Sequence, residues 1–427
     1  MSEAANVASR ADLDDKLRRL FLSDPAVMAD PVPIWTELRE AGPVYHHGKV
    51  ILFTKSRGVK KLINDPRAVH NAAGKGKRAE AARAALPDDG KTAFDVVTAF
   101  EGMYMSRNDG ETHDRLRRIA QRTFTPKRIG QIGEIIETTA QQYLTDLAAQ
   151  GPVVDFMEFA YSLPLKIIGD LLAIPGEDLA KVHEWSSRLG RNRGGTDYQP
   201  LMDAHRALGE FRAYVTGIIK MLRDRPRSDD EIDLIGDLLD ANQQESLDDA
   251  ELVAMFVVLL FAGHETTTNL IGTGLLSLLR TGEWGRLVGR PDQVSRAVEE
   301  LVRYVSPVQW LSRNIAEPME VEGQALSPGD TVLLMIASAN RDPELFPDRP
   351  EALDIERDAR GHLGFGRGSH ICLGSHLAKM EAISAFTALV NRFPDLKLAA
   401  ADVTWSGNAS LRGLAALPIA LGEERRR

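Results

Sequence analysis

The chain has one cysteine in 427 residues, Cys372, within the segment 365–374, Phe-Gly-Arg-Gly-Ser-His-Ile-Cys-Leu-Gly. A single thiol cannot form a disulfide within the chain, and it cannot build a zinc site of several cysteines. It can be an axial ligand of a heme iron if it is deprotonated and held by backbone donors. Gly366 and Gly368 allow the positive φ angles of such a loop, and Gly374 lets the backbone approach a flat macrocycle. The alternative is a buried, inert cysteine.

A second feature is the apolar segment Glu251–Arg280, which has helical spacing and is apolar on nearly all sides. This pattern predicts a buried central helix. Ser246-Leu247-Asp248-Asp249 fits a capping box at its start. Its interior is interrupted by Ala-Gly-His-Glu-Thr-Thr-Thr-Asn at 262–269. Polar groups in a buried helix are costly without partners, so this break needs an explanation.

The break has a chemical use. Ala262 and Gly263 are small enough to leave room for a diatomic ligand on iron, and Glu265 and Thr266 can pass protons to it. We expect Thr266 to bond to the preceding turn and open the helix locally. The alternative is a helix kink with satisfied polar groups. A zinc-protease pattern fails because position 268 is threonine where a histidine is needed.

Both segments match one family. The cysteine segment has the form F-G-x-G-x-H-x-C-x-G, and the helix break has the form A/G-G-x-D/E-T-T. The chain therefore resembles the cytochrome P-450 family, from about Trp35 to Pro418. The resemblance implies a mainly α fold with small β-sheets and heme b between the long helix and the cysteine loop. It implies Cys372 as the iron ligand. It also implies heme contacts from Phe365, Gly366, Gly374 and Ala262.

The same resemblance assigns further charged residues. His113 and Arg117, four apart on a predicted helix, look like the family's propionate-binding cations, with Arg313 and His370 completing the set.

Glu300 and Arg303 match the family's E-x-x-R pair, which implies a buried structural ion pair. The family commonly supplies an arginine near this pair where this chain has Ala352. Arg349 or Arg357 is expected to replace it.

The activity implied is that of a heme-thiolate monooxygenase, an oxidoreductase that inserts one atom of O2 into an apolar small molecule by hydroxylation or epoxidation. Thr266 and Glu265 would be the catalytic proton relay. Electrons would come from NAD(P)H through a separate ferredoxin and its reductase, since one cysteine cannot hold an iron–sulfur cluster. A peroxide-driven peroxygenase of the same fold and a non-enzymatic heme sensor or carrier are the alternatives.

Positions relative to the matched motifs predict a substrate pocket lined by Val258, Phe261, Ala262, Gln309, Trp310, Leu311, Phe94 and Met103. Ordinary core packing is the alternative for all of them. Arg115, Arg118 and Arg367 are the expected basic residues for docking a ferredoxin.

Composition limits the remaining possibilities. Hydrophobic residues make up 43% and charged residues 26%, as in ordinary globular proteins. The net charge of −9 disfavours a nucleic-acid partner. The N-terminus has no apolar signal-peptide core, and the longest apolar run, Leu252–Gly263, is too short to span a bilayer. These features predict a cytoplasmic protein without a membrane anchor.

We expect an N-terminal extension over 1–34, partly ordered, followed by a single domain over 35–427. Residues 44–46 and 50–53 predict a hairpin, and 319–336 predict strands broken by turns. Segments 74–91 and 188–200 are rich in small and basic residues, which indicates surface loops that could cover a substrate channel.

Overall fold

A computed structural model of the protein describes residues 3–70, 77–122, 124, 126–192, 197–223, 234–243 and 247–425. The chain divides into two compact units. One, here called the sheet unit, comprises residues 1–68, 137–162 and 266–427. The other, here called the helical unit, comprises residues 69–136 and 163–265.

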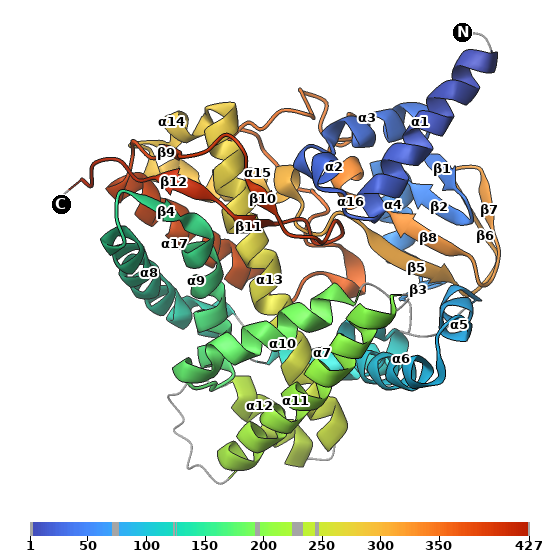
Figure 1. The fold of residues 1–427 in the computed structure, drawn as a ribbon, viewed down its shortest axis with the longest axis horizontal. Helices are drawn as coiled ribbons and strands as arrows, with labels where there is room; N and C mark the ends of the chain where they lie inside the picture. The colour runs from blue at the N-terminus through green and yellow to red at the C-terminus, as the bar shows by residue number, and fades with distance from the viewer. Residues whose placement is uncertain are drawn as a thin grey trace. The chain divides into compact units, whose positions relative to one another are not determined.

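The sheet unit contains a five-stranded sheet with strand order β1-β2-β8-β5-β3 (Figure 1). Its strands are β1 (Val44–His47), β2 (Val50–Phe53), β3 (Ala68–Val69), β5 (Leu311–Ile315) and β8 (Thr331–Leu334). β1 and β2 form the predicted hairpin. β8 pairs in parallel with β2, although the two strands lie far apart in the sequence. β5 runs antiparallel to β8 and sets Arg313 opposite Val332. The strands predicted at 319–336 are also present, as β6 (Met319–Val321), β7 (Gln324–Leu326) and β8.

The two faces of this sheet carry separate apolar clusters, because successive side chains of a strand point to opposite sides. Ile51, Phe53 and Leu334 join one cluster with helix α4 (Ser56–Asn64). Leu52 and Leu333 join the other, with side chains from α1 (Glu3–Phe21) and α3 (Val32–Ala41). Consecutive apolar residues in β2 and β8 therefore supply both faces of the sheet.

The N-terminal helix α1 is part of this packing. Leu13, Leu17 and Leu20 of α1 are buried on the sheet. The helix α2 (Pro25–Ala29) follows, and the Ser23 hydroxyl accepts the Ala409 N–H at 3.1 Å. The N-terminal segment is thus tied to a segment near the C-terminus.

The sheet unit contains further helices, turns and strands, several of which lie away from the five-stranded sheet (Figure 1). Its helices are α14 (Glu283–Leu287), α15 (Val294–Val305), α16 (Ile336–Ala339) and α17 (Ser375–Arg392). Its short 3-10 turns are η3 (Pro291–Gln293) and η4 (Gly368–His370). Its minor strands are β4 (Val153–Asp155), β9 (Lys397–Leu398), β10 (Thr404–Trp405), β11 (Leu414–Ala416) and β12 (Pro418–Ala420).

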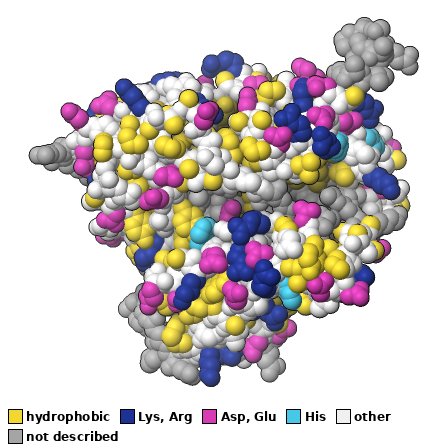
Figure 2. All heavy atoms as spheres, viewed as in Figure 1, with side chains coloured by type: hydrophobic (Ala, Val, Ile, Leu, Met, Phe, Trp, Pro, Cys, Tyr) yellow, Lys and Arg dark blue, Asp and Glu magenta, His cyan; other side chains and the backbone are white. Residues whose placement is uncertain are grey.

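The helical unit is held by aromatic contacts and ion pairs between helices. Its elements are α5 (Lys77–Ala84), α6 (Asp88–Glu101), η1 (Met105–Arg107), α7 (Gly110–Gln121), η2 (Gly176–Asp178), α10 (Leu179–Arg191), α11 (Tyr198–Arg223) and α12 (Leu234–Gln243). Trp185 of α10 stacks on Phe211 of α11 with 5.4 Å between ring centroids. Arg188 of α10 pairs with Asp203 of α11 at 2.9 Å. On the face of the molecule drawn in Figure 2, basic and acidic side chains are interspersed.

Three helices belong partly to each unit, namely α8 (Pro126–Ala149), α9 (Phe156–Leu171) and α13 (Asp249–Thr281). α13 is the predicted central helix. It is long and apolar enough to cross a membrane by length and composition alone, which the shorter run Leu252–Gly263 did not indicate. However, 61% of its most apolar window is buried inside the protein, as in the core helix of a globular protein.

The start of α13 differs in detail from the predicted capping box. The Asp248 carboxylate accepts the Glu251 N–H at 2.7 Å, and Glu251 accepts the Asp248 N–H at 3.1 Å. This is a reciprocal capping box whose N-cap is Asp248. The predicted Ser246 lies outside the described residues.

The two predicted surface loops are wrong over most of their length. Residues 77–84 and 88–101 are helical, and helices α10 and α11 occupy the described ends of 188–200. Alanine, lysine, arginine and glutamate are strong helix formers, so the first segment has helical propensity despite its polarity. Residues 74–76 and 193–196 lie outside the described residues.

Candidate active site

The cysteine loop of the sheet unit joins a tight turn to the start of α17. The Cys372 N–H donates to the Phe365 carbonyl at 2.8 Å, which closes the loop. Gly366 and Gly368 have φ angles of 68° and 69°, so both adopt the left-handed conformation expected of them. An added Cβ at Gly368 would lie 2.7 Å from Asn64 Oδ1. This close contact favours glycine at position 368 in addition to the positive φ angle.

Cys372 is exposed, so a buried and inert cysteine is excluded. α17 begins three residues later, at Ser375, and the positive end of a helix lowers the free energy of a nearby thiolate. An added Cβ at Gly374 would meet no described atom within 4 Å. Protein neighbours therefore do not require glycine there, whereas a flat ring lying on this backbone would. The exposed thiol and this open glycine fit a heme bound on the loop.

Two of the four predicted propionate partners lie in the sheet unit. Arg313, in the middle of β5, is 2% exposed, and its Nη1 donates to the Ser312 carbonyl at 2.8 Å. His370 ends η4 and is half-buried. A guanidinium this deeply buried favours an anionic neighbour, because burying a charge alone is costly.

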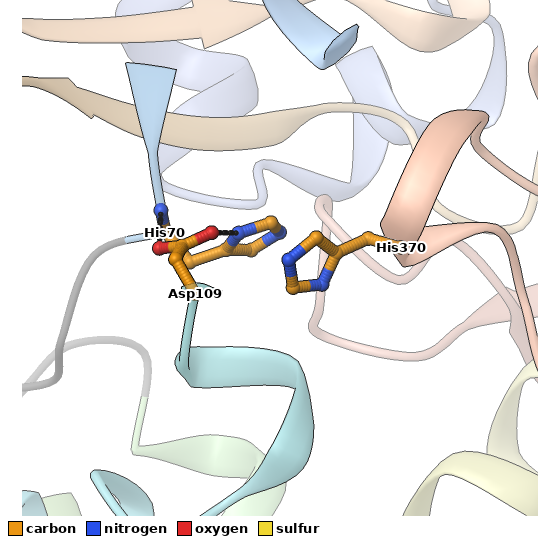
Figure 3. Close-up of side chains that lie close together, drawn as sticks. All are labelled: His70, Asp109 and His370. Carbon is orange, nitrogen blue, oxygen red and sulfur yellow. Dashed lines mark hydrogen bonds and ion pairs between the residues drawn. The ribbon is translucent and has the colours of Figure 1, made fainter. Parts of the chain in front are cut away.

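The other two partners lie on α7 of the helical unit. His113 is 1% exposed and its Nδ1 lies 3.0 Å from the Asp114 carboxylate, while Arg117 is half-buried one turn later. The residue before α7, Asp109, accepts the His70 N–H with Oδ2 and contacts His70 Nδ1 with Oδ1, both at 2.8 Å (Figure 3). This pair fixes the beginning of the helix that carries both cations.

The polar break of α13 is helical throughout, so the predicted local opening is not part of this structure. Ala262 is exposed although most residues in the middle of α13 are buried, and Glu265 and Thr266 are half-buried. Burial raises the pKa of Glu265 above its usual value. An added Cβ at Gly263 would lie 3.0 Å from Ile168 of α9, so this glycine lets the two helices pack closely.

The His264 side chain, also within 262–269, is buried inside the protein. It is completely buried, and its Nδ1 lies 2.7 Å from the Leu260 carbonyl. Burial lowers the pKa of His264 to about 4, so the imidazole is neutral at physiological pH.

The predicted pocket residues have varied surroundings. In the helical unit, Phe94 and Val258 are buried, while Met103 and Phe261 are half-buried. The Phe261 ring packs on Gly190, where an added Cβ would lie 3.1 Å from Cε2.

In the sheet unit, packing accounts for the three residues predicted near β5. The buried Gln309 amide donates to the carbonyls of Val305 and Ser306 at the end of α15. Trp310 packs edge-on against Phe21 of α1 at 5.2 Å. Leu311 packs on the sheet cluster that contains Ile51 and Phe53.

Glu300 and Arg303 of α15 form a completely buried ion pair. Arg303 Nε and Nη2 donate to the two Glu300 oxygens at 2.7 and 2.8 Å. The remaining guanidinium donors bind the carbonyls of Asn340, Pro350 and Ala352 at 2.8–2.9 Å.

This pair reaches the cysteine loop through Asn340. The Asn340 side chain donates to the Ser306 hydroxyl at 2.9 Å and accepts the Leu363 N–H at 2.7 Å. Leu363 in turn accepts the Gly366 N–H at 2.9 Å. The ion pair therefore determines where the loop begins.

The arginine that replaces the one missing at Ala352 is Arg357. Its Nε lies 3.2 Å from Glu300 Oε1, and its side chain is 8% exposed. Arg349 is 66% exposed and pairs with Asp354 at 3.1 Å.

Sequence reasoning did not find Glu381. This side chain of α17 is completely buried, and neither carboxylate oxygen has a hydrogen-bond partner among the residues that the structure describes. Burial raises the pKa of Glu381 well above its usual value. In the sequence, the position of Glu381 among the apolar residues of α17 could have indicated a buried carboxyl group.

Known proteins are similar to this chain in sequence and in fold. A family model described as cytochrome P-450 matches residues 198–284 and 294–402. The vitamin D(3) 25-hydroxylase of Pseudonocardia autotrophica is 34% identical over 403 residues, covering 92% of this chain and 94% of that one. The polyketide biosynthesis cytochrome P-450 PksS of Bacillus subtilis is 37% identical over 329 residues, covering 76% and 79%.

A solved structure, ligand-free CYP164A2 of Mycobacterium smegmatis, superimposes with a TM-score of 0.84 at 30% identity, covering 95% of this chain and all of that one. The chain belongs to the cytochrome P-450 family, and the mainly α fold predicted from the sequence is confirmed. Within that family it is an oxidoreductase, a monooxygenase of the bacterial type.

The geometry around Glu300 predicts unequal effects for two arginines. Arg357→Ala removes a buried partner of a buried carboxylate and should lower the free energy of unfolding by about 1–3 kcal/mol. Arg349→Ala removes an exposed pair and should change it by about 0.5 kcal/mol or less. Urea unfolding of the two variants measures the difference, and equal losses would contradict the assignment of Arg357.

Glu381 predicts a dependence of stability on pH. Because its pKa is raised on folding, the stability it contributes is complete below the usual glutamate pKa and is lost as pH rises through the raised value. Glu381→Gln should therefore exceed the wild type in free energy of unfolding by a margin that grows as the pH rises above the usual glutamate pKa. The exposed Glu320→Gln serves as the control. A constant margin would show that Glu381 is ionised in the folded protein.

Proposed function

We propose that the protein binds heme b through Cys372 and oxygenates an apolar molecule of small or medium size. The exposed Cys372 thiol on a loop closed by its own backbone N–H is the observation that carries this proposal. By correspondence of motifs, His113, Arg117, Arg313 and His370 bind the propionates. Phe365, Gly366, Gly374 and Ala262 contact the macrocycle in the same assignment. The proposed domain is a single one over 35–427.

When bound, the heme iron supplies dioxygen binding and cleavage of the O–O bond. The balanced reaction consumes the substrate, O2, two electrons and two protons, and it yields the hydroxylated product and water. In the proposed mechanism the chain's own residues deliver the protons. Burial raises the pKa of Glu265, so this carboxyl holds a proton at a pH where an exposed glutamate has lost it. Glu265 passes that proton to the Thr266 hydroxyl, the next residue of α13.

The substrate is expected to be apolar. Of the two curated relatives described above, one is named as a 25-hydroxylase of vitamin D(3), a largely hydrocarbon molecule, and the other is named for polyketide biosynthesis. Phe94, Val258, Phe261 and Met103 are the apolar side chains of the helical unit proposed to contact it.

The proposed electron donor is a ferredoxin, reduced by NAD(P)H through its reductase, and the proposed location is the cytoplasm. Arg118 and Arg367 are exposed, as cations that dock a partner must be. Arg115 is a weaker candidate because both of its terminal nitrogens bind the Glu251 carboxylate.

The experiment that tests this function uses the full chain loaded with hemin. We expect the reduced carbonyl adduct to show the absorption of thiolate ligation, and Cys372→Ser to lose it. With NADPH, ferredoxin and reductase, one atom of ¹⁸O2 should appear in the product of an apolar substrate. Label from H2O2 alone would identify a peroxygenase. Heme binding without oxidation of any bound apolar compound would identify a sensor or carrier.

The proton relay makes its own prediction. Thr266→Ala should lower the product formed per NADPH about tenfold or more and release hydrogen peroxide instead, because proton delivery contributes at least that much to such steps. Thr273→Ala is the matched control, since Thr273 is a buried threonine two turns further along α13 whose hydroxyl donates to the Asn269 carbonyl. Unchanged coupling in Thr266→Ala would remove the relay from the mechanism.

A further inference from the structure

The turn before the cysteine loop contains a buried histidine that the function described so far does not use. The His362 side chain is 4% exposed. Its Nδ1 accepts the Gly364 N–H at 3.0 Å, and its Nε2 lies 3.2 Å from Glu299 Oε1 on α15. Both ring nitrogens therefore have a defined neighbour within the sheet unit.

Glu299 places a carboxylate beside the Nε2 atom of His362. Contact with His362, followed by Lys379, holds the pKa of Glu299 at about 2 despite its burial, so the carboxylate is ionised. The Lys379 Nζ lies 3.2 Å from Glu299 Oε2. An anion facing Nε2 favours a proton there, and Nδ1 is then left with the lone pair that Gly364 needs.

The Gly364 backbone packs closely against Val302 of α15. An added Cβ at Gly364 would lie 2.6 Å from Val302 Cγ1 and 3.0 Å from the Val302 carbonyl. The next residue, Phe365, accepts the Cys372 N–H at 2.8 Å. The Phe365 ring also contacts the ring of His362 at 5.7 Å and lies 5.8 Å from the Lys379 ammonium.

These contacts form one continuous path. It runs from the Glu299 carboxylate through the His362 ring to the Gly364 N–H, and then along the backbone to the carbonyl that holds Cys372. The direction of the Phe365 carbonyl decides how the cysteine backbone is oriented. A shift of the 362–364 turn therefore changes the position of the sulfur without touching it.

We propose that His362 is a positioning residue for the Cys372 thiolate, and that Glu299 holds its ring in the tautomer whose Nδ1 accepts the Gly364 N–H. The proposal rests on the proposed heme ligation by Cys372. It assigns His362 a role through the loop backbone, with no contact to iron or substrate. The necessary property of the side chain is an acceptor at the place of Nδ1.

Substitutions of His362 can distinguish the effect of the hydrogen-bond acceptor from the effect of side-chain volume. In His362→Asn the amide oxygen takes the place of Nδ1, whereas in His362→Gln the polar group takes the place of Nε2. His362→Leu fills the space without either. The exposed His376→Leu, on the first turn of α17, is the matched control for loss of a histidine from this region.

The test compares these variants as hemin-loaded full chains. We expect His362→Asn and His376→Leu to keep the thiolate absorption of the reduced carbonyl adduct. His362→Gln and His362→Leu should lose it about tenfold faster than wild type, because each leaves the Gly364 donor without an acceptor. If His362→Leu is as persistent as wild type, or if His362→Asn decays like His362→Leu, the positioning role is overturned.

A measurement on heme-free protein tests the tautomer directly. With ¹⁵N-labelled histidine, the His362 signals should show an unprotonated Nδ1 and a protonated Nε2, and Glu299→Gln should reduce that preference. A protonated Nδ1 in the wild type would overturn the inference even with heme ligation intact. A wild-type holoprotein without thiolate absorption would instead overturn the proposed function, so the two failures are distinguishable.

Discussion

The buried guanidinium of Arg303 is the constraint on which the cysteine side of the molecule depends. All five of its N–H bonds are used, two on Glu300 and three on backbone carbonyls of Asn340, Pro350 and Ala352. A charge with no exposure is tolerated only when every donor is satisfied, so these chain segments must come together in one arrangement. The Asn340 side chain then accepts the Leu363 N–H and so connects these segments to the turn before the cysteine loop. The loop is positioned by two polar connections, one through Asn340 and one through His362.

Local chemistry explains what could be predicted from the sequence. The glycines of the cysteine loop, the hairpin over 44–53 and the turn at Glu322-Gly323 each follow from backbone conformations that few residue types adopt. Cys372 could be identified from the sequence because a single cysteine flanked by these glycines is suited to binding a heme iron. The capping box of α13 was correct in kind but two residues displaced, because several nearby acidic and hydroxyl residues satisfy the same pattern.

Contacts between distant segments explain what could not be predicted. Arg357 and Arg349 look equivalent in the sequence, and only the path of the chain after Ala352 brings Arg357 to Glu300. The close approach of Gly263 to Ile168 of another helix is not visible in the sequence around Gly263. The ring contact of Trp310 with Phe21 joins positions almost three hundred residues apart, so no local pattern indicates it. Periodicity indicates which face of a strand is apolar but not what covers that face.

Helix α1 and the segment at Ala409 belong to one apolar cluster, which has a consequence for synthesis. Leu13 and Leu17 leave the ribosome long before β8 and Ala409 exist, yet these late segments complete the surface that buries them. The nascent chain must therefore carry exposed apolar side chains through most of translation, a condition in which aggregation and chaperone binding compete with folding. Expression at low temperature or with added chaperones should favour recovery of intact protein.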